Sequence, residues 1–339
     1  MCHEYVGVIH IHTTASDGCG TFEEVVASGK KAGLDFLIIT DHDVLQHKEK
    51  EGWYGRLLVL VGEEISPPKA HYLALNIQRA IPPSSNPQSY IDEVNRQKGF
   101  GFITHPYHKE RRLPFLPPHP WEDFPMYSFF QGIEIWSLMY DWVKKVNFLT
   151  LPYYLLFPIR HLSGPPPRLL KEWDRLCKKE KIVGIAGLDV HGNKVFPFSI
   201  FSYTFTFRTL RTHIWCKKLT GNFSQDKESV YRALKEGNSF FALDIIGDSK
   251  GFLFTTEMGD LPGSVVKLRK PMYLRFFSPL KANFRFIHNG KILKKIFGKR
   301  GELKIEKGGV YRLEGYLKNK PWLFTNPFWI EDEDFHFKK

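Results

Sequence analysis

The sequence predicts an α/β protein in which a sheet of parallel strands, open or closed into a barrel, is followed by a small all-β sandwich. Short apolar segments alternate with polar loops and helical patterns over the first two thirds of the chain, which is typical of parallel sheets. These apolar segments show no polar alternation, as expected for strands that are buried on both faces. After about residue 245, only short β-like segments separated by turn residues follow. We therefore expect a barrel-type domain over 1–245 and a β-sandwich over 246–339.

The elements of the first domain follow in a regular order. Helices are expected at 21–35, 89–98, 168–180 and 229–237, and the first has Thr21 as N-cap with Glu24 at the capping-box position. An aromatic- and Pro-rich insertion over 138–168 is interpreted as packing on the barrel, as a substrate lid or as a membrane-surface contact. In the sandwich, Asn289-Gly290 predicts a hairpin turn. Strands are expected at 5–11, 36–40, 57–65, 71–77, 99–105, 132–137 and 182–189.

The composition and charge of the chain limit its expected cellular location and its expected partners. The formal net charge of +12 favours anionic partners, and solubility is the simpler explanation because Lys is scattered along the chain. The 4 Cys form no CxxC pair, and the N-terminus lacks a signal-peptide pattern, so we expect a cytoplasmic protein. No apolar run is long enough for a membrane span. We expect a small anionic substrate and no nucleic acid, and leave a homo-oligomer open.

Imidazoles and carboxylates gather where the expected strands end. A lone His or Asp at such a place is usually a hydrogen-bonded or capping residue. Here many of them follow successive strands, and so many buried polar groups are stabilised most simply by metal ions. Such ligands suit Zn, Mn or Fe. The candidate ligands are His10, His12, Asp17, His42, Glu63, His71, His105, Asp189 and His191.

Five ordered motifs resemble those of the polymerase and histidinol phosphatase (PHP) superfamily. They are HIHTTASDG at 10–18, TDHD at 40–43, GEE at 62–64, ITHP at 103–106 and GLDVH at 187–191. The segments at 209–215 and 321–330 are similar to a carbaryl-hydrolase-like branch with a C-terminal β-sandwich. The resemblance implies a distorted seven-stranded (β/α) barrel with two or three divalent metals.

The resemblance also implies an allocation of ligands. His10, His12, Glu63 and Asp189 would hold one metal, with Glu63 bridging to another. Asp17, His42 and His191 would surround a second, and Glu63, His71 and His105 a third. Asp17 stands where relatives with three metals often carry His.

Such a centre implies hydrolysis by a metal-bridging hydroxide. Asp17 or Asp43 would move a proton, although Asp43 is also explained as a partner of a ligating His. Glu134 is expected beside the ligands rather than among them. For substrate binding, the sequence offers Lys109, Arg111, Arg112 and Arg208, with a solvated loop as the simpler explanation of the first three.

Three functions fit these residues. A phosphoesterase acting on a small anionic phosphate ester is the leading hypothesis. A carbamate, ester or amide hydrolase would use the same centre, and the apolar insertion favours it. A non-catalytic metal-binding module is the third.

Overall fold

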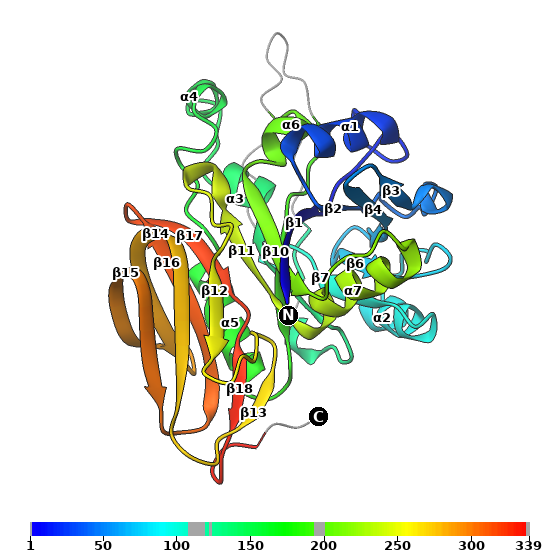
Figure 1. The fold of residues 1–339 in the computed structure, drawn as a ribbon. Coiled ribbons are helices and arrows are strands. Elements are labelled where there is room, and N and C mark those ends of the chain that lie inside the picture. The colour runs from blue at the N-terminus through cyan, green and yellow to red at the C-terminus, as the bar shows by residue number, and fades with distance from the viewer. Residues whose placement is uncertain (1, 108–118, 122–123, 193–200, 337–339) are drawn as a thin grey trace. The chain divides into compact units, whose positions relative to one another are not determined.

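The computed structural model describes residues 2–107, 119–121, 124–192 and 201–336 (Figure 1). Backbone contacts divide the chain into two compact units. Unit 1 comprises Met1–Val6, Pro167–Ile185 and Arg211–Lys339, and unit 2 comprises Gly7–Pro166 and Ala186–Leu210. Neither unit ends at the expected boundary near residue 245, because the segments 167–185 and 211–245 fold with the C-terminal strands.

Unit 2 contains most of the expected strands and two of the four expected helices, those at 21–35 and 89–98. Parallel pairing joins β1 to β2 and β2 to β4, while β7 and β8 are also parallel. Strand β6 departs from the expected parallel order and pairs antiparallel with β5 and β7. The short 66–71 loop explains the β5–β6 pairing, since a parallel crossover needs a dozen or more residues. The elements are β1 (His3–Ile9, from Gly7), α1 (Phe22–Ala32), β2 (Phe36–Ile39), η1 (Lys48–Lys50), β3 (Gly52–Tyr54), β4 (Leu57–Val61), β5 (Glu63–Ile65), β6 (Tyr72–Leu75), α2 (Pro87–Arg96), β7 (Phe100–Ile103), η2 (Phe124–Met126), β8 (Gly132–Ser137), α3 (Leu138–Val143), α4 (Leu151–Leu156), the end of β9 (Val183–Gly187) and α6 (Tyr203–Thr206).

Short connections and isolated β-bridges link the ends of neighbouring strands in unit 2. Only Gly62 separates β4 from β5. Isolated parallel bridges then connect His42 with Glu64, and Ile11 with Val190. These joins gather the residues that follow β1, β2 and β9 around β5, which positions the candidate site.

Helix α1 begins as the sequence predicts. The Thr21 side chain accepts a hydrogen bond from the Glu24 amide, and the Glu24 carboxylate accepts one from the Thr21 amide. The helix ends at Gly33, whose φ of 72° lies in the left-handed region. Helices α1 and α6 lie side by side in this unit (Figure 1).

The insertion of unit 2 forms the two short helices α3 and α4. Around α4 the large side chains of Phe148, Leu149 and Leu156 are exposed. Among the described residues, no helix is both long and apolar enough to cross a membrane.

Unit 1 is dominated by antiparallel strands. Strand β14 is irregular between Phe277 and Ala282: its first part pairs with β12 and its second with β16. Such a strand can contribute to two faces, as sandwiches require. The Asn289-Gly290 turn has φ values of 51° and 83°, as the predicted hairpin needs. The elements are α5 (Pro167–Cys177), the start of β9, β10 (Leu210–Cys216), α7 (Phe223–Glu236), β11 (Ser239–Leu243), η3 (Asp244–Ile246), β12 (Leu253–Thr256), β13 (Val265–Lys267), β14 (Met272–His288), β15 (Lys291–Ile305), β16 (Gly309–Leu317), β17 (Lys320–Thr325) and β18 (Phe328–Glu331).

Polar contacts explain why earlier segments belong to unit 1. The Arg312 guanidinium donates to both oxygens of Asp174 in α5, at 2.7 and 2.8 Å. The Trp329 indole donates to the Cys177 carbonyl. An aromatic core of the strands, which includes Phe254, Phe276, Phe284 and Trp322, completes the packing of the unit.

Candidate metal centre

The candidate ligands of unit 2, with the exception of Glu63, come together near the ends of the strands. His10 and His12 follow β1, His42 follows β2, and His105 follows β7. His71 directly precedes β6. Asp189 and His191 follow β9.

Glu64 lies at the centre of this cluster and is completely buried. Its Oε2 lies 3.2 Å from His10 Nε2, 3.4 Å from His12 Nε2 and 3.1 Å from His42 Nδ1. Its Oε1 lies 3.1 Å from His71 Nδ1 and 3.2 Å from His105 Nε2. One carboxylate therefore contacts five imidazoles.

The expectation that Glu63 faces the cluster is wrong, because its neighbour Glu64 takes that place. The Glu63 carboxylate points away from the imidazoles and accepts a hydrogen bond from the Ile81 amide at 3.0 Å. Adjacent residues of a strand project to opposite faces, so only one of the two can face the cluster. Burial raises the pKa of Glu63 to about 8, and the charge of Asp43 adds to this effect. The hydrogen bond from the Ile81 amide lowers the pKa but is outweighed.

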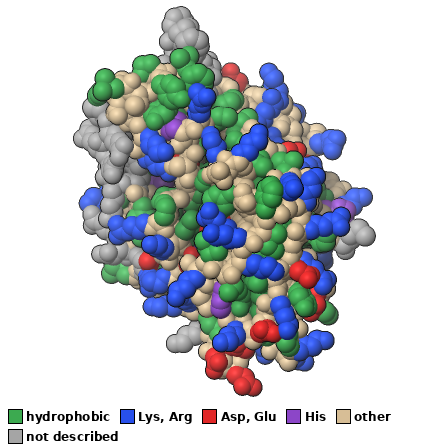
Figure 2. All heavy atoms as spheres, turned by 90° about the vertical axis from the view of Figure 1, so that its left-hand side faces the viewer, with side chains coloured by type: hydrophobic (Ala, Val, Ile, Leu, Met, Phe, Trp, Pro, Cys, Tyr) green, Lys and Arg blue, Asp and Glu red, His purple; other side chains and the backbone are tan. Residues whose placement is uncertain are grey.

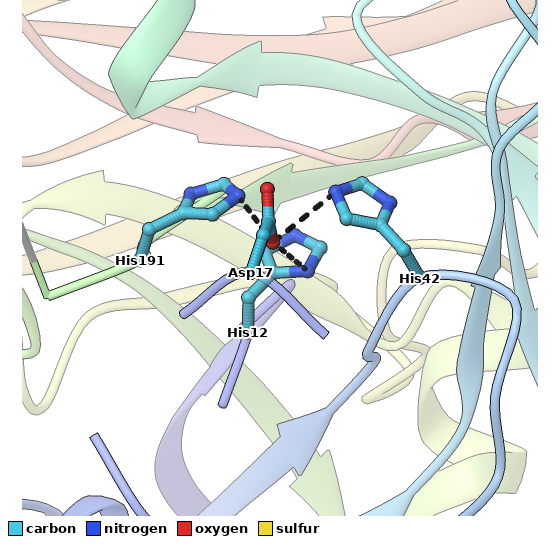
Figure 3. A group of neighbouring side chains, drawn as sticks. All are labelled: His12, Asp17, His42 and His191. Carbon is cyan, nitrogen blue, oxygen red and sulfur yellow. Dashed lines mark ion pairs between the residues drawn. The ribbon is translucent and has the colours of Figure 1, made fainter. Parts of the chain in front are cut away.

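Asp17 organises the solvent-facing side of the cluster. Figure 3 shows its carboxylate between three imidazoles. Its Oδ1 lies 3.2 Å from His191 Nε2, 3.6 Å from His42 Nε2 and 3.9 Å from His12 Nδ1. The Asp17 side chain is 58% exposed, whereas that of His12 is fully buried. This part of the cluster is therefore open to solvent.

The side chains form three groups whose ligand atoms lie close enough to hold a metal ion. Asp189 closes one of them, because its Oδ1 lies 3.3 Å from His10 Nε2 and 3.2 Å from His12 Nε2. His105 stands outside these groups, although it contacts Glu64. The groups are His10, His12, Glu64 and Asp189; His12, Asp17, His42 and His191; and His42, Glu64 and His71.

Two observations show that these side chains fit metal ions. Several buried ligand atoms have no hydrogen-bond partner among the described residues, including His10 Nε2, both His12 ring nitrogens and Glu64 Oε2. Such orphaned atoms are costly unless something binds them. The separations are also suitable, because two ligands on a tetrahedral ion at about 2.0–2.1 Å lie about 3.3 Å apart.

Charges within the cluster set the protonation of its members. Burial disfavours ionised Glu64 and Asp189, but the surrounding imidazoles hold the pKa of both well below the usual range. Burial and the neighbouring His191 and His42 lower the pKa of His12 to about 4. Ionised carboxylates and a neutral imidazole are the forms that bind metals. Burial opposes the charge of His10 and His191, but neighbouring carboxylates raise the pKa of His10 and bring that of His191 to about 9, so these two imidazoles must release a proton when a metal binds.

Glu134 and Gly187 help to position the candidate ligands His10 and His105. The buried Glu134 Oε1 lies 3.3 Å from His10 Nδ1, and its Oε2 accepts from the His105 amide at 3.1 Å. A carboxylate on the second nitrogen of a ligating His fixes the orientation and tautomer of the ring. A Cβ on Gly187 would lie only 2.0 Å from Glu134 Oε1, so a larger residue here would displace this carboxylate. The expectation for Glu134 agrees with this placement.

Two buried residues that the motifs did not single out hold the ligand loops. Asp41 accepts from the Thr13 amide, the Thr13 hydroxyl and the Ser16 hydroxyl, which fixes the loop that carries Asp17. The Tyr203 hydroxyl bonds the carbonyls of His12 and His191. Asp41 lies within a quoted motif, but Tyr203 has no local signal, because its partners are far away in the sequence.

Further rings stack on the ligands. Tyr140 lies 4.2 Å from His105 between ring centroids, and His119 lies 4.2 Å from His71. Neither residue was expected at the site.

Of the other expected site residues, Asp43 lies beside the cluster, Arg208 has a partner elsewhere, and three lie outside the described residues. Asp43 Oδ1 accepts from the Ser66 amide at 2.7 Å, and the Ser66 hydroxyl lies 2.5 Å from His42 Nδ1. Arg208 is exposed and donates to the Lys31 carbonyl at the end of α1, so no contact links it to the cluster. Lys109, Arg111 and Arg112 lie outside the described residues.

Four residues at or beside this site have an unusual backbone conformation. His10, Asp43, His105 and Asp189 have φ values of 71°, 53°, 31° and 53°, in or near the left-handed region that non-glycine residues rarely adopt. Each such residue costs about 1–3 kcal/mol and persists only where its surroundings enforce it. The side chains of His10, His105 and Asp189 contact the cluster, whereas the Asp43 carboxylate accepts from the Ser66 amide.

The chain matches no family profile and no curated protein sequence. It is similar to the crystal structure of a two-domain protein from Bacteroides vulgatus that contains a predicted PHP-like metal-dependent phosphoesterase. The identity is 14%, over 96% of this chain and 95% of that chain, with a TM-score of 0.49.

Two further solved structures each cover 55% of this chain and 87% of their own, at 15% identity. One is a putative metal-dependent phosphoesterase from Bifidobacterium adolescentis, with a TM-score of 0.37. The other is an amidohydrolase from Chromobacterium violaceum with bound sulfate and no metal, with a TM-score of 0.31.

Proposed function

We propose that this chain is a metal-dependent hydrolase of the PHP type, whose unit 2 is a distorted seven-stranded barrel. The observation that carries the proposal is the buried cluster around Glu64, with its unpartnered ligand atoms. The one-residue connection at Gly62 and the bridges His42–Glu64 and Ile11–Val190 link successive strands of the unit. This continuity supports the barrel.

The three groups would hold two or three divalent metals. Glu64 belongs to two of the groups and is the proposed bridge. His105 is a proposed ligand beside His71, since both contact the same Glu64 oxygen. Bound metals of this kind supply Lewis acidity, which activates water near neutral pH and stabilises developing negative charge.

The protein's own residues would orient and open the site. Asp17 is the proposed proton acceptor, because its carboxylate is both exposed and in contact with His191. For Asp43 we propose a positioning role through Ser66, since its carboxylate is already engaged with the loop beside His42. Glu134 would hold His10 in one orientation.

We propose a phosphate ester as the substrate class. The resemblance of the five motifs to those of PHP phosphoesterases supports this class. Carbamate, ester or amide hydrolysis is the alternative, supported by the exposed apolar side chains around α4.

A substrate panel tests the proposal. The metal-replete protein should hydrolyse p-nitrophenyl phosphate or its diester, lose this activity on chelation and regain it when metal is added. Turnover restricted to aryl esters or carbamates would assign the alternative. A chain that binds no metal under these conditions would contradict both.

A further inference from the structure

Strands β14 and β15 of unit 1 carry an unusual excess of positive charge. The hairpin 272–305 contains nine Lys and Arg residues and one acidic residue, Glu302, in a chain whose net charge is +12. Most of the net charge of the protein thus comes from a single hairpin. Charge of one sign concentrated on one element indicates an anionic partner.

The same hairpin exposes large apolar side chains. Phe277, Ile292, Leu293 and Phe297 are 42%, 48%, 53% and 62% exposed. Figure 2 shows hydrophobic side chains interleaved with Lys and Arg on the face that it presents. Apolar groups of this size, gathered on one element, mark a contact surface.

Strand alternation places basic and aromatic groups on the outward side of the hairpin. The inward residues of β14, such as Phe284 and Phe286, are buried. On the outward side, the Lys281 ammonium lies 4.8 Å from the centre of the Phe297 ring, and the Arg300 guanidinium lies 5.5 Å from that of Phe277. We call this side the basic–apolar face: Phe277, Lys281, Leu293, Lys295, Phe297 and Lys299.

Two simpler explanations account for only part of this face. Lys residues on an edge strand prevent pairing with a second copy of the chain. Within the described residues β15 pairs only with β14, so this explains the Lys side chains but not the exposed Leu293 and Phe297. A nucleic acid would contact the cations and stack bases on the aromatic rings, but it offers little to the aliphatic Leu293.

We propose that the basic–apolar face docks unit 1 on an anionic lipid bilayer. Lys and Arg contact the headgroup phosphates, while Phe297 and Leu293 enter the boundary between headgroups and acyl chains. Peripheral membrane elements combine these two properties. The inference is independent of the reaction proposed for unit 2.

Vesicle co-sedimentation of the full-length protein tests the proposal. Binding should require phosphatidylserine in phosphatidylcholine vesicles and weaken as salt is added. The double variant Lys295→Glu/Lys299→Glu should bind at least about tenfold more weakly, since each basic residue near an anionic surface contributes about 1 kcal/mol. Lys217→Glu/Lys218→Glu, on an exposed loop of unit 1, is the matched control, and its vesicle binding should weaken less than that of the first variant.

A second variant separates insertion from charge. Leu293→Ser/Phe297→Ser keeps every charge and should weaken vesicle binding by about fivefold or more, because burying a large apolar side chain completely is worth about 1.5–3 kcal/mol. Equal binding to neutral and anionic vesicles, or equal losses in the control pair, would overturn the proposal. So would capture of a single-stranded RNA oligonucleotide by this face while vesicle binding is unaffected by all three variants.

Discussion

The adjacent residues Glu63 and Glu64 offer a sharp test of the metal centre. Replacing Glu64 with Gln keeps the shape of the side chain but removes its charge. In the structure this carboxylate contacts five imidazole nitrogens at 3.1–3.4 Å. The variant should therefore lose metal, while Glu63→Gln should keep it.

The expected size of the effect follows from the contacts. Interactions with a charged partner are worth about 1.5–3 kcal/mol each. If Glu64 bridges two ions, the neutral amide forfeits about 3–6 kcal/mol, which weakens metal binding by about 10²–10⁴-fold. In Glu63→Gln, the amide oxygen can still accept from the Ile81 amide, so metal affinity should change by less than about threefold.

Metal content after dialysis against graded chelator concentrations measures the difference. Circular dichroism and thermal unfolding of both variants establish that each is folded. The reasoning is refuted if the folded Glu64→Gln protein retains its metal, or if the Glu63→Gln protein loses it to the same extent. Loss of hydrolysis in Glu64→Gln without loss of metal would restrict the role of Glu64 to catalysis.

Three other predictions follow from the packing. Gly187→Ala should displace the Glu134 carboxylate and weaken metal binding by about 10–100-fold, and chelator titration would show no change if the contact were unimportant. Arg312→Met should destabilise unit 1 by about 3–5 kcal/mol, because it leaves buried Asp174 unpaired; urea unfolding measures this, and a loss below about 1 kcal/mol would contradict it. The buried His213 lies between the carboxylates of Glu4 and Asp244. Burial opposes its charge, but these partners raise its pKa to about 9. Its contribution to folding stability is therefore complete below about pH 6.5 and is lost as the pH rises through 9. The melting-temperature deficit of His213→Gln should therefore be larger at pH 6 than at pH 10, and an equal deficit at both would exclude this linkage.

The sequence was sufficient for much of the site because spacing carries geometric information. His10 and His12 are two residues apart, so both were expected on one face of the chain, and both contact Glu64. The choice between Glu63 and Glu64 had no such signal. Every residue of β4 and β5 is buried, so no polar alternation shows which side faces the cluster.

The division of the chain was harder to predict. Helix α5 has an apolar face that could cover either unit, and its pattern does not say which. The Asp174–Arg312 pair that ties α5 to unit 1 joins residues separated by 138 positions. No local pattern in either segment predicts such a contact, whereas hairpin turns such as Asn289-Gly290 are determined by neighbouring residues.

His71 shows how a wrong strand direction can still leave a site residue in the right place. The expectation of parallel strands places chemistry at their carboxyl ends, yet His71 precedes β6. Because β6 runs antiparallel to β5 and β7, its amino end lies beside the carboxyl end of β7. The short return from β5 therefore brings His71 to the same rim as His105, and both rings contact one oxygen of Glu64. Reversing this strand would carry His71 about four residues, or roughly 13 Å, away from that oxygen, so its place in the centre depends on the antiparallel turn rather than on the strand-end rule.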